Sequence, residues 1–340
     1  METAAGKAPR VESKLTLRDR LGGWKVRWDI GRMNYKVDPG LYALGHPDAD
    51  SPVFISANFK MSFDHLRTSL NDGRSGWILV LDTDGINVWC AAGKGTFGTE
   101  ELANRIESSG LAGVVKHRTV IVPQLGAPGV SAREVQKRSG FKVVYGPVRA
   151  ADLPDFLDAG MKAAPGMRIK TFETGERMSL VPVEIVHAVK NLVWVLPFVI
   201  LLSGFSGRGA FLSHALQFGS VSVIGLLTAI AAGCVITPML LPWLPGRAFS
   251  LKGVWPGIVC AALFLFVRDV LWGLHPAGAL ETFAWVLVIP AVSAYLAMNF
   301  TGCSTFTSLS GVKKEMKWAV PAQIAAVGLG AVLWVTSIFV

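Results

Sequence analysis

The chain has 340 residues and a formal net charge of +9. This length is enough for two domains of ordinary size. A basic protein can bind nucleic acid, but many of these positive charges flank long apolar segments, as they do at the cytoplasmic ends of membrane helices. We therefore expect no nucleic-acid partner.

The apolar residues are unevenly distributed along the chain. Residues 1–184 carry charges throughout, whereas residues 185–340 are dominated by long apolar runs. The first residues contain Lys and Arg but no apolar core of the kind that a secretory signal requires. The sequence predicts a cytoplasmic soluble domain over 1–165, a linker over 166–184 and a membrane domain over 185–340.

Short apolar runs in the soluble half predict four strands, over 52–57, 76–82, 118–122 and 141–145. Helical patterns lie between or after them, at about 61–71, 99–109, 131–138 and 152–160. Continuous apolar strands suit a sheet that is covered on both faces. The alternation of strands and helices predicts an α/β, Rossmann-like fold with a mainly parallel sheet.

The second half contains apolar segments long enough to span a bilayer, which takes ~20 residues. The candidates are 186–204, 215–241, 254–274, 282–300 and 318–339. In the second of these, Pro238 predicts a kink or an end. Arg268 in the third is expected to extend its side chain to the membrane interface, with an ion or proton path as the alternative.

The loops between these segments predict the orientation of the chain in the membrane. Loops 242–253 and 301–317 contain several Lys and Arg, whereas loops 205–214 and 275–281 contain Arg208 alone. Positive loops stay in the cytoplasm. We therefore expect a multi-pass protein of the cytoplasmic membrane, with the soluble domain inside and the C-terminus outside.

The loops that follow the predicted strands are rich in Gly and Pro. They are 82–85, 123–129 and 145–150, and ligands of parallel sheets bind at this edge. Glycine lets a backbone approach a large flat ligand closely. Although each loop alone could be an ordinary turn, the three together predict a cofactor site that includes Gly126, Gly146, Pro147 and Ala150.

Four cysteines are present, and none lies in a C-x-x-C pair. This argues against zinc or an iron–sulfur cluster held by this chain alone. Cys234 and Cys260 fall in predicted membrane helices, where we expect small buried residues. Cys303 falls at an inner helix end, where we expect a plain loop residue, with a relay for a metal ion as the alternative.

Cys90 has the most distinctive surroundings of the four. The run Gly93-Lys94-Gly95-Thr96 is no phosphate loop, because that motif needs a Gly five residues before Gly93 and a Ser or Thr directly after the Lys.

A helix that starts here would place the thiol near its positive end. Asn87 suits a helix N-cap, which puts Cys90 in the first turn, where the helix dipole favours thiolate. Lys94 lies four residues on, on the same face. Ala91, Ala92 and Gly93 would keep the surface low, so that a broad ring could lie against it. A reactive thiol, a soft metal ligand and a buried structural cysteine all remain open on these grounds.

The full run resembles the signature of the corrinoid protein of the mercury-methylation pair, the HgcA family, and the resemblance extends over the whole chain. The run is Asn87-Val88-Trp89-Cys90-Ala91-Ala92-Gly93-Lys94. The soluble half is similar to the corrinoid-binding domain of the corrinoid iron–sulfur protein of the acetyl-CoA pathway. The resemblance implies a corrinoid-binding α/β domain followed by an all-α membrane domain of about five helices.

The resemblance also implies the cofactor and its ligands. A cobalamin-type corrinoid would bind with its own base displaced, Cys90 would be the lower axial ligand of cobalt as thiolate, and 87–94 would be a cap helix beneath the cobalt. Lys60, Met61 and Ser62 lie in a stretch, 58–64, that is also typical of the family.

The implied activity is that of a corrinoid-dependent methyltransferase, which passes a methyl group from cobalt to Hg(II) and gives methylmercury. The implied partners are a dicluster ferredoxin of the HgcB type and a methylfolate-type donor or its methyltransferase. The chain has no cluster motif, unlike its acetyl-CoA-pathway relative, so we expect no iron–sulfur cluster in it. The alternatives are a membrane-bound corrinoid methyl carrier of one-carbon metabolism and a membrane scaffold or transporter whose soluble half binds a regulatory ligand.

Overall fold

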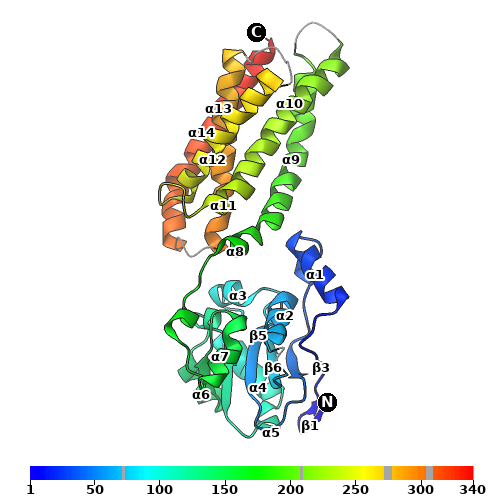
Figure 1. Ribbon diagram of the computed structural model, residues 1–340, viewed down its shortest axis with the longest axis vertical. Helices are drawn as coiled ribbons and strands as arrows, with labels where there is room; N and C mark the ends of the chain where they lie inside the picture. Colours follow the sequence, from blue (N-terminus) through cyan, green and yellow to red (C-terminus); the bar gives the residue numbers. More distant parts are fainter. Residues whose placement is uncertain (71–72, 207–209, 272–277, 304–308, 340) are drawn as a thin grey trace. The chain divides into compact units, whose positions relative to one another are not determined.

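The computed structural model describes residues 1–70, 73–206, 210–271, 278–303 and 309–339. The chain divides into two compact units, Met1–Lys170 and Thr171–Val340 (Figure 1). Arg208 and the side chain of Cys303, on which two of the expectations above rest, lie outside the described part of the structure.

The N-terminal unit is built on a six-stranded sheet with the order β3-β4-β6-β5-β7-β8. Strands β5, β6, β7 and β8 run parallel, whereas β4 pairs antiparallel with β6. The strand bounds are β3 Arg10–Val11, β4 Gly40–Leu44, β5 Val53–Ala57, β6 Gly76–Leu81, β7 Thr119–Val122 and β8 Lys142–Tyr145. A separate hairpin joins β1 Glu2–Thr3 to β2 Gly6–Lys7. The four predicted strands are confirmed, and so is the mainly parallel α/β sheet.

Helices cover both faces of this sheet. The predicted helices are present as α2 Lys60–Ser69, α4 Thr99–Ser108, α6 Ala132–Ser139 and α7 Leu153–Asp158. The others are α1 Leu17–Arg27, α3 Val88–Lys94 and α5 Leu111–Val114, with short 3₁₀ turns η1 Arg32–Asn34, η2 Gln124–Gly126, η3 Ala150–Asp152 and η4 Pro165–Arg168.

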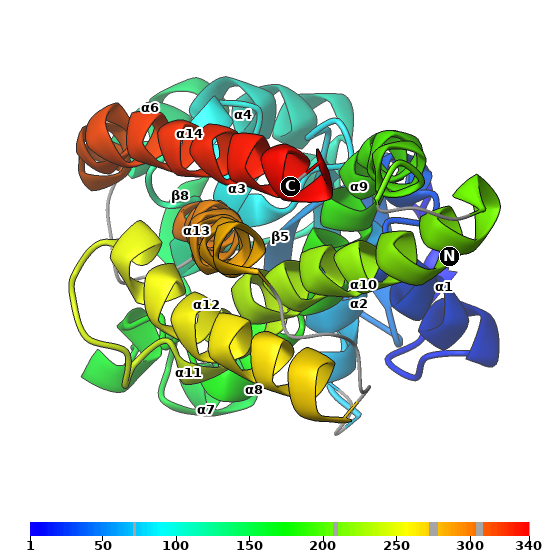
Figure 2. The ribbon, with the colours of Figure 1, turned by 90° about the horizontal axis from the view of Figure 1, so that it is seen from above.

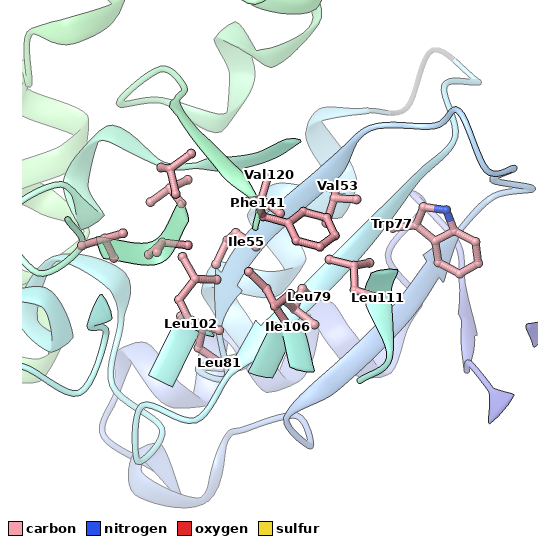
Figure 3. Packing of buried hydrophobic residues seen from close by; sticks show 14 of the residues in the cluster. Val53, Ile55, Trp77, Leu79, Leu81, Leu102, Ile106, Leu111, Val120 and Phe141 are labelled. Carbon is pink, nitrogen blue, oxygen red and sulfur yellow. The ribbon is translucent and has the colours of Figure 1, made fainter. Parts of the chain in front are cut away.

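Alternate strand residues form two hydrophobic clusters, one on each face. Ile55 and Leu79 pack with Leu102 and Ile106 of α4 on one face (Figure 3). On the other face the intervening strand residues pack against α2 and α7. This two-sided burial explains why the strands read as continuous apolar runs in the sequence.

The C-terminal unit is helical (Figure 2). Its α-helices are α8 Thr174–Met178, α9 Val181–Ser203, α10 Phe211–Ala231, α11 Thr237–Leu240, α12 Phe249–Phe266, α13 Ala279–Met298 and α14 Leu309–Phe339, with π-helical turns η5 Ala232–Ile236 and η6 Val267–Leu271 and a 3₁₀ turn η7 Asn299–Cys303. Within the described residues, five stretches are long and apolar enough to cross a membrane: Thr174–Ser203, Phe211–Leu240, Phe249–Val270, Ala279–Thr301 and Ser310–Phe339. The predicted helical region with about five candidate membrane spans is confirmed.

Two details of this unit concern the expectations for Pro238 and Arg268. The irregularity near Pro238 takes the form of the π-helical turn η5 directly before it, and the second span continues to Leu240. The Arg268 side chain is 4% exposed and lies 2.8 Å from the carboxylate of Glu281. This acidic partner, which lies 13 residues later in the chain, was not predicted from the sequence.

The stretch that was expected to be a linker, 166–184, has regular structure over much of its length. It contains the end of η4, all of α8 and the first residues of α9. Arg177 of α8 is buried and donates a hydrogen bond of 2.7 Å to the carbonyl oxygen of Pro238. This part of the stretch therefore packs as part of the helical unit.

Candidate functional site at the Cys90 helix

Cys90 lies in the first turn of the short helix α3. Asn87 is the N-cap, and its side-chain oxygen accepts a hydrogen bond of 3.0 Å from the backbone N–H of Cys90. The predicted cap and helix start are confirmed. The Cys90 side chain is exposed, so the interpretation of a buried structural cysteine is wrong.

The exposed face of α3 is narrower than the sequence indicated. Cys90, Gly93 and Lys94 are exposed and share one face, as residues three and four positions apart do in a helix. Ala91 and Ala92 are instead buried in the hydrophobic cluster beneath the helix. These two alanines hold α3 against the core. Of the three small residues, only Gly93 lies on the exposed face of the helix. Val88 and Trp89 are half-buried.

Asn58, directly after β5, fixes the loop that leads from β6 to α3. Its side chain is buried, and its oxygen accepts hydrogen bonds from the backbone N–H groups of Thr83 at 3.2 Å and Gly85 at 2.9 Å. Its amide nitrogen donates to the Asp82 carboxylate at 2.9 Å. A single amide therefore connects the ends of two neighbouring parallel strands.

The same loop turns sharply through two residues with positive φ. Asp84 has φ 55° and Gly85 has φ 72°, and the turn is closed by a 3.0 Å hydrogen bond from the N–H of Ile86 to the carbonyl oxygen of Thr83. Asp and Gly are the residue types that tolerate this conformation best. The turn directs the chain into α3 with the Cys90 side chain outward.

The loop after β7 supports α3 from the side. A Cβ at Gly126 would overlap the Phe97 ring, and one at Gly129 would overlap the Phe97 carbonyl oxygen and lie 3.1 Å from the Cα of Ala92. Gly126 was predicted to touch a cofactor. In this structure it is buried and packs against Phe97, so its role here is to let the loop approach the end of α3 closely.

In the loop after β8, Gly146 and Pro147 are buried. The N–H of Gly146 donates to the carbonyl oxygen of Val122 at 2.8 Å, and the carbonyl oxygen of Pro147 accepts from the N–H of Gln124 at 3.3 Å. Ala150 packs against the second hydrophobic cluster. The register of β5 to β8 places all these loops at one edge of the sheet, as predicted.

Lys60, Met61 and Ser62 form the first turn of α2, which follows β5. The Lys60 ammonium lies 2.6 Å from the Asp19 carboxylate and 2.8 Å from that of Asp64. Burial opposes the charged form of Lys60, but the hydrogen bonds to both carboxylates outweigh it and raise the pKa of Lys60. The positive charge of Lys60 is therefore balanced by two carboxylates of the same unit.

Three supporting residues were not singled out in the sequence: Asn58, Thr83 and Phe97. A polar residue directly after a predicted strand was a usable signal for Asn58. Nothing local marks Phe97, because its importance comes from two glycines about thirty residues later. Among the described residues no group of three or more His, Cys, Asp or Glu could hold a metal ion.

Comparisons with known proteins show what the N-terminal unit is similar to. Residues 29–157 match the family model of the CO dehydrogenase/acetyl-CoA synthase delta subunit. The chain is also similar to acetyl-CoA decarbonylase/synthase complex subunit gamma of Archaeoglobus fulgidus, with 32% identity over 128 residues that cover 37% of this chain and 27% of the relative. The same subunit of Methanocaldococcus jannaschii is 34% identical over 122 residues, which cover 36% of this chain and 25% of the relative.

The matched region thus spans about a quarter of the length of these relatives. The family match extends from before β4 to α7 and includes α3 with Cys90. The soluble half of the chain is therefore similar to subunits of the acetyl-CoA decarbonylase/synthase complex, as its resemblance to the corrinoid protein of that pathway led us to expect.

Proposed function

We propose that this chain is a membrane-anchored corrinoid protein that transfers a methyl group from cobalt to Hg(II), which gives methylmercury. The observation that carries the proposal is the exposed thiol of Cys90, in the first turn of a capped helix at the carboxyl edge of a parallel sheet. This helix lies within residues 29–157, which match the family model of the CO dehydrogenase/acetyl-CoA synthase delta subunit.

The residues on the exposed face of α3 fit a corrinoid. A cobalt centre needs one soft axial donor, and a thiolate is such a donor. The broad ring around it needs a surface without large side chains. Gly93, one turn after Cys90, is exposed, and a Cβ there would meet nothing within 4 Å. Cys90 would hold the cobalt, and Gly93 would let the ring lie close to the helix.

The remaining residues would keep that donor in place. Asn87 caps α3, Asn58 fixes the loop before it, and Gly126 lets the loop after β7 pack against Phe97. Such a second layer of rigid contacts is what holds a functional group in its working geometry. When bound, the corrinoid would supply the cobalt that carries the methyl group and releases it with its bonding electron pair to the mercuric ion.

Renewed loading with methyl requires electrons and a donor, which we assign to a dicluster ferredoxin of the HgcB type and to a methylfolate-type donor or its methyltransferase. Both are cytoplasmic in this proposal. The Lys and Arg of loop 242–253, together with Lys313, Lys314 and Lys317, support a cytoplasmic position of the N-terminal unit. The five candidate spans support a multi-pass membrane protein.

The test is an anaerobic assay of the purified full chain with corrinoid, the ferredoxin, a methyl donor and Hg(II). We expect methylmercury from the unchanged chain and none from Cys90→Ala, with Cys90→Thr severely impaired. Cys260→Ala, which changes a buried cysteine of the helical unit, is the matched control and should retain activity. Normal methylmercury formation by Cys90→Ala would contradict the proposal.

A second candidate is a membrane-bound corrinoid methyl carrier of one-carbon metabolism. It is favoured by the relatives, which are subunits of an acetyl-CoA decarbonylase/synthase complex. The same preparation distinguishes the two functions. A chain that binds corrinoid and accepts methyl, but transfers it to other methyl acceptors and not to Hg(II), would support the carrier.

A further inference from the structure

Helix α1 lies at the periphery of the N-terminal unit beside α2 (Figure 1). A stripe of large apolar side chains runs along its outer face. Leu17, Leu21 and Trp24 are 73%, 51% and 59% exposed. Trp28, the C-cap residue, continues the stripe and lies with its ring 6.1 Å from that of Trp24. At 3.6 residues per turn these four positions fall within about 60° of one another around the helix.

The opposite face of α1 is fixed to the rest of the unit. Val26 is 1% exposed. The Asp19 carboxylate pairs with Lys60 at 2.6 Å and with Arg67 at 2.9 Å, both on α2. The Tyr35 hydroxyl donates to the carbonyl oxygen of Asp19 at 3.1 Å. This network sets the rotation of the helix, so the apolar stripe is held outward.

Basic residues flank the stripe on both sides. By the same helical geometry, Arg18 and Lys25 lie along one side and Arg20 and Arg27 along the other. Arg18, Arg20 and Lys25 are exposed. Asp19, the acidic residue of this helix, is turned inward and paired. The outer half of α1 therefore combines an apolar centre with two positive borders.

We infer that this face of α1 docks onto the surface of an anionic lipid bilayer. An apolar stripe with Trp and flanking Lys and Arg is the pattern of helices that lie in the plane of a membrane interface. Each basic residue near an anionic surface adds attraction. A soluble partner would have to present a complementary apolar and acidic surface, whereas a bilayer presents apolar chains and negative headgroups together.

The covalent chain keeps a bilayer within reach. The N-terminal unit ends at Lys170, and the first candidate membrane span begins at Thr174. Four residues of extended chain cover at most roughly 14 Å. The unit therefore encounters the membrane surface at a high local concentration, and even a weakly binding helix will dock. This inference needs the membrane spans but does not depend on the corrinoid function.

The test places the full chain in lipid nanodiscs that contain a phosphatidylcholine with a photoreactive diazirine near the top of one acyl chain. Cross-linked peptides are then identified by mass spectrometry. One set of discs is zwitterionic, and in the other about a third of the lipid is phosphatidylglycerol. We expect cross-links within 17–28, more in the anionic discs. Helix α6 is the internal control, because its exposed Arg133, Lys137 and Arg138 have no exposed apolar stripe beside them.

Two variants separate the apolar and the electrostatic contributions. Leu21→Asp with Trp24→Asp should abolish cross-linking of α1, and Arg18→Gln with Arg20→Gln and Lys25→Gln should lower it several-fold in anionic discs only. Replacing Arg133, Lys137 and Arg138 by Gln is the matched control and should change nothing. Unchanged melting temperatures will show that the variants fold.

The inference is overturned if α1 cross-links to lipid no more than α6 does. A yield that is equal in both kinds of disc and unaffected by the charge variant would overturn the assignment to anionic lipid. Protein cross-links that join α1 to another chain or segment, in place of lipid cross-links, would assign the stripe to a protein partner and likewise overturn it.

Discussion

The side-chain oxygen of Asn58 lies 2.9 Å from the backbone nitrogen of Gly85, 27 residues later in the chain. It also accepts from the N–H of Thr83, and all of these groups are buried. Asn58→Ala would leave two buried N–H groups without their acceptor, each of which costs about 1–3 kcal/mol. We predict a loss of local stability of about 2–5 kcal/mol, measured by hydrogen exchange of β6 and α3, together with weaker corrinoid binding.

Asn34→Ala is the control for this prediction, because Asn34 is exposed. It should leave both the exchange of β6 and corrinoid binding unchanged. If Asn58→Ala exchanged at the same rate as the control, the positioning role of Asn58 would be wrong.

Gly93 and Gly129 are predicted to respond in opposite ways to the same substitution. A Cβ at Gly129 would overlap Phe97 and crowd Ala92, so Gly129→Ala should lower the melting temperature and displace α3. A Cβ at Gly93 meets nothing, and Ala is favoured over Gly in a helix by up to about 1 kcal/mol. Gly93→Ala should therefore leave the stability unchanged or raise it.

Corrinoid titration followed by visible absorption then tests the proposed face of α3. Gly93→Ala should bind corrinoid more weakly although it is as stable as the unchanged chain, because its methyl group would lie under the ring. If this stable variant bound corrinoid as tightly as the unchanged chain does, Gly93 would not be part of the corrinoid site.

The pairing of Asp19 predicts how the attachment of α1 depends on pH. Burial would raise the pKa of Asp19, but hydrogen bonds from Lys60, Thr16 and Arg67 outweigh it and lower that pKa far below its ordinary value. A carboxyl whose pKa is lower in the folded state stabilises the fold above its unfolded pKa, and this stabilisation is lost as pH falls towards the folded value.

We therefore expect α1 to loosen progressively as pH falls below about 4. Hydrogen exchange of residues 17–27, corrected for intrinsic rates, is the measurement. Asp19→Asn should loosen α1 already at neutral pH and flatten the acid response. Asp50→Asn, which alters an exposed ion pair, should behave like the unchanged chain, and an identical acid response in both variants would contradict the role of Asp19.

The buried pair of Arg268 and Glu281 gives a prediction for the helical unit. Arg268 is 4% exposed, and its Nε and Nη1 atoms have no hydrogen-bond partner among the described residues. Glu281→Gln would remove the partner of a buried charge, which costs about 3–5 kcal/mol. We expect a clearly lower unfolding temperature of the full chain in detergent.

Replacing both residues by Leu should recover most of that loss, because two apolar side chains can substitute for a buried ion pair. Asp158→Asn, which affects the more exposed pair with Arg74, serves as the control and should change little. An unfolding temperature of Glu281→Gln equal to that of the control would show that the pair contributes nothing.

Much of the fold could be predicted because burial leaves a strong local pattern. The four parallel strands and the five apolar spans are continuous hydrophobic segments, and Asn87 has the chemistry of an N-cap. β4 was not predicted because its first three residues are only half-buried, so it does not form a continuous apolar run. It is also followed directly by β5, without the intervening helix that marks the other strands. The pairing of Arg268 with Glu281 was missed because a long-range ion pair leaves no local pattern.

The candidate site was only partly predictable for the same reason. The position of Cys90 in the first turn follows from local sequence. The inward direction of Ala91 and Ala92, and the packing of Gly126 on Phe97, depend on how α3 lies against the sheet. Local sequence could thus locate the thiol but not determine which of its neighbours face outward with it.

The most direct test of the central claim is X-ray absorption at the cobalt edge of the corrinoid-loaded full chain. We predict a sulfur scatterer bound to cobalt in the unchanged chain and in Cys260→Ala, and its loss in Cys90→Ala. Cobalt surrounded by nitrogen and oxygen alone in the unchanged chain, or a sulfur ligand that persists in Cys90→Ala, would contradict the assignment of Cys90 as the axial ligand.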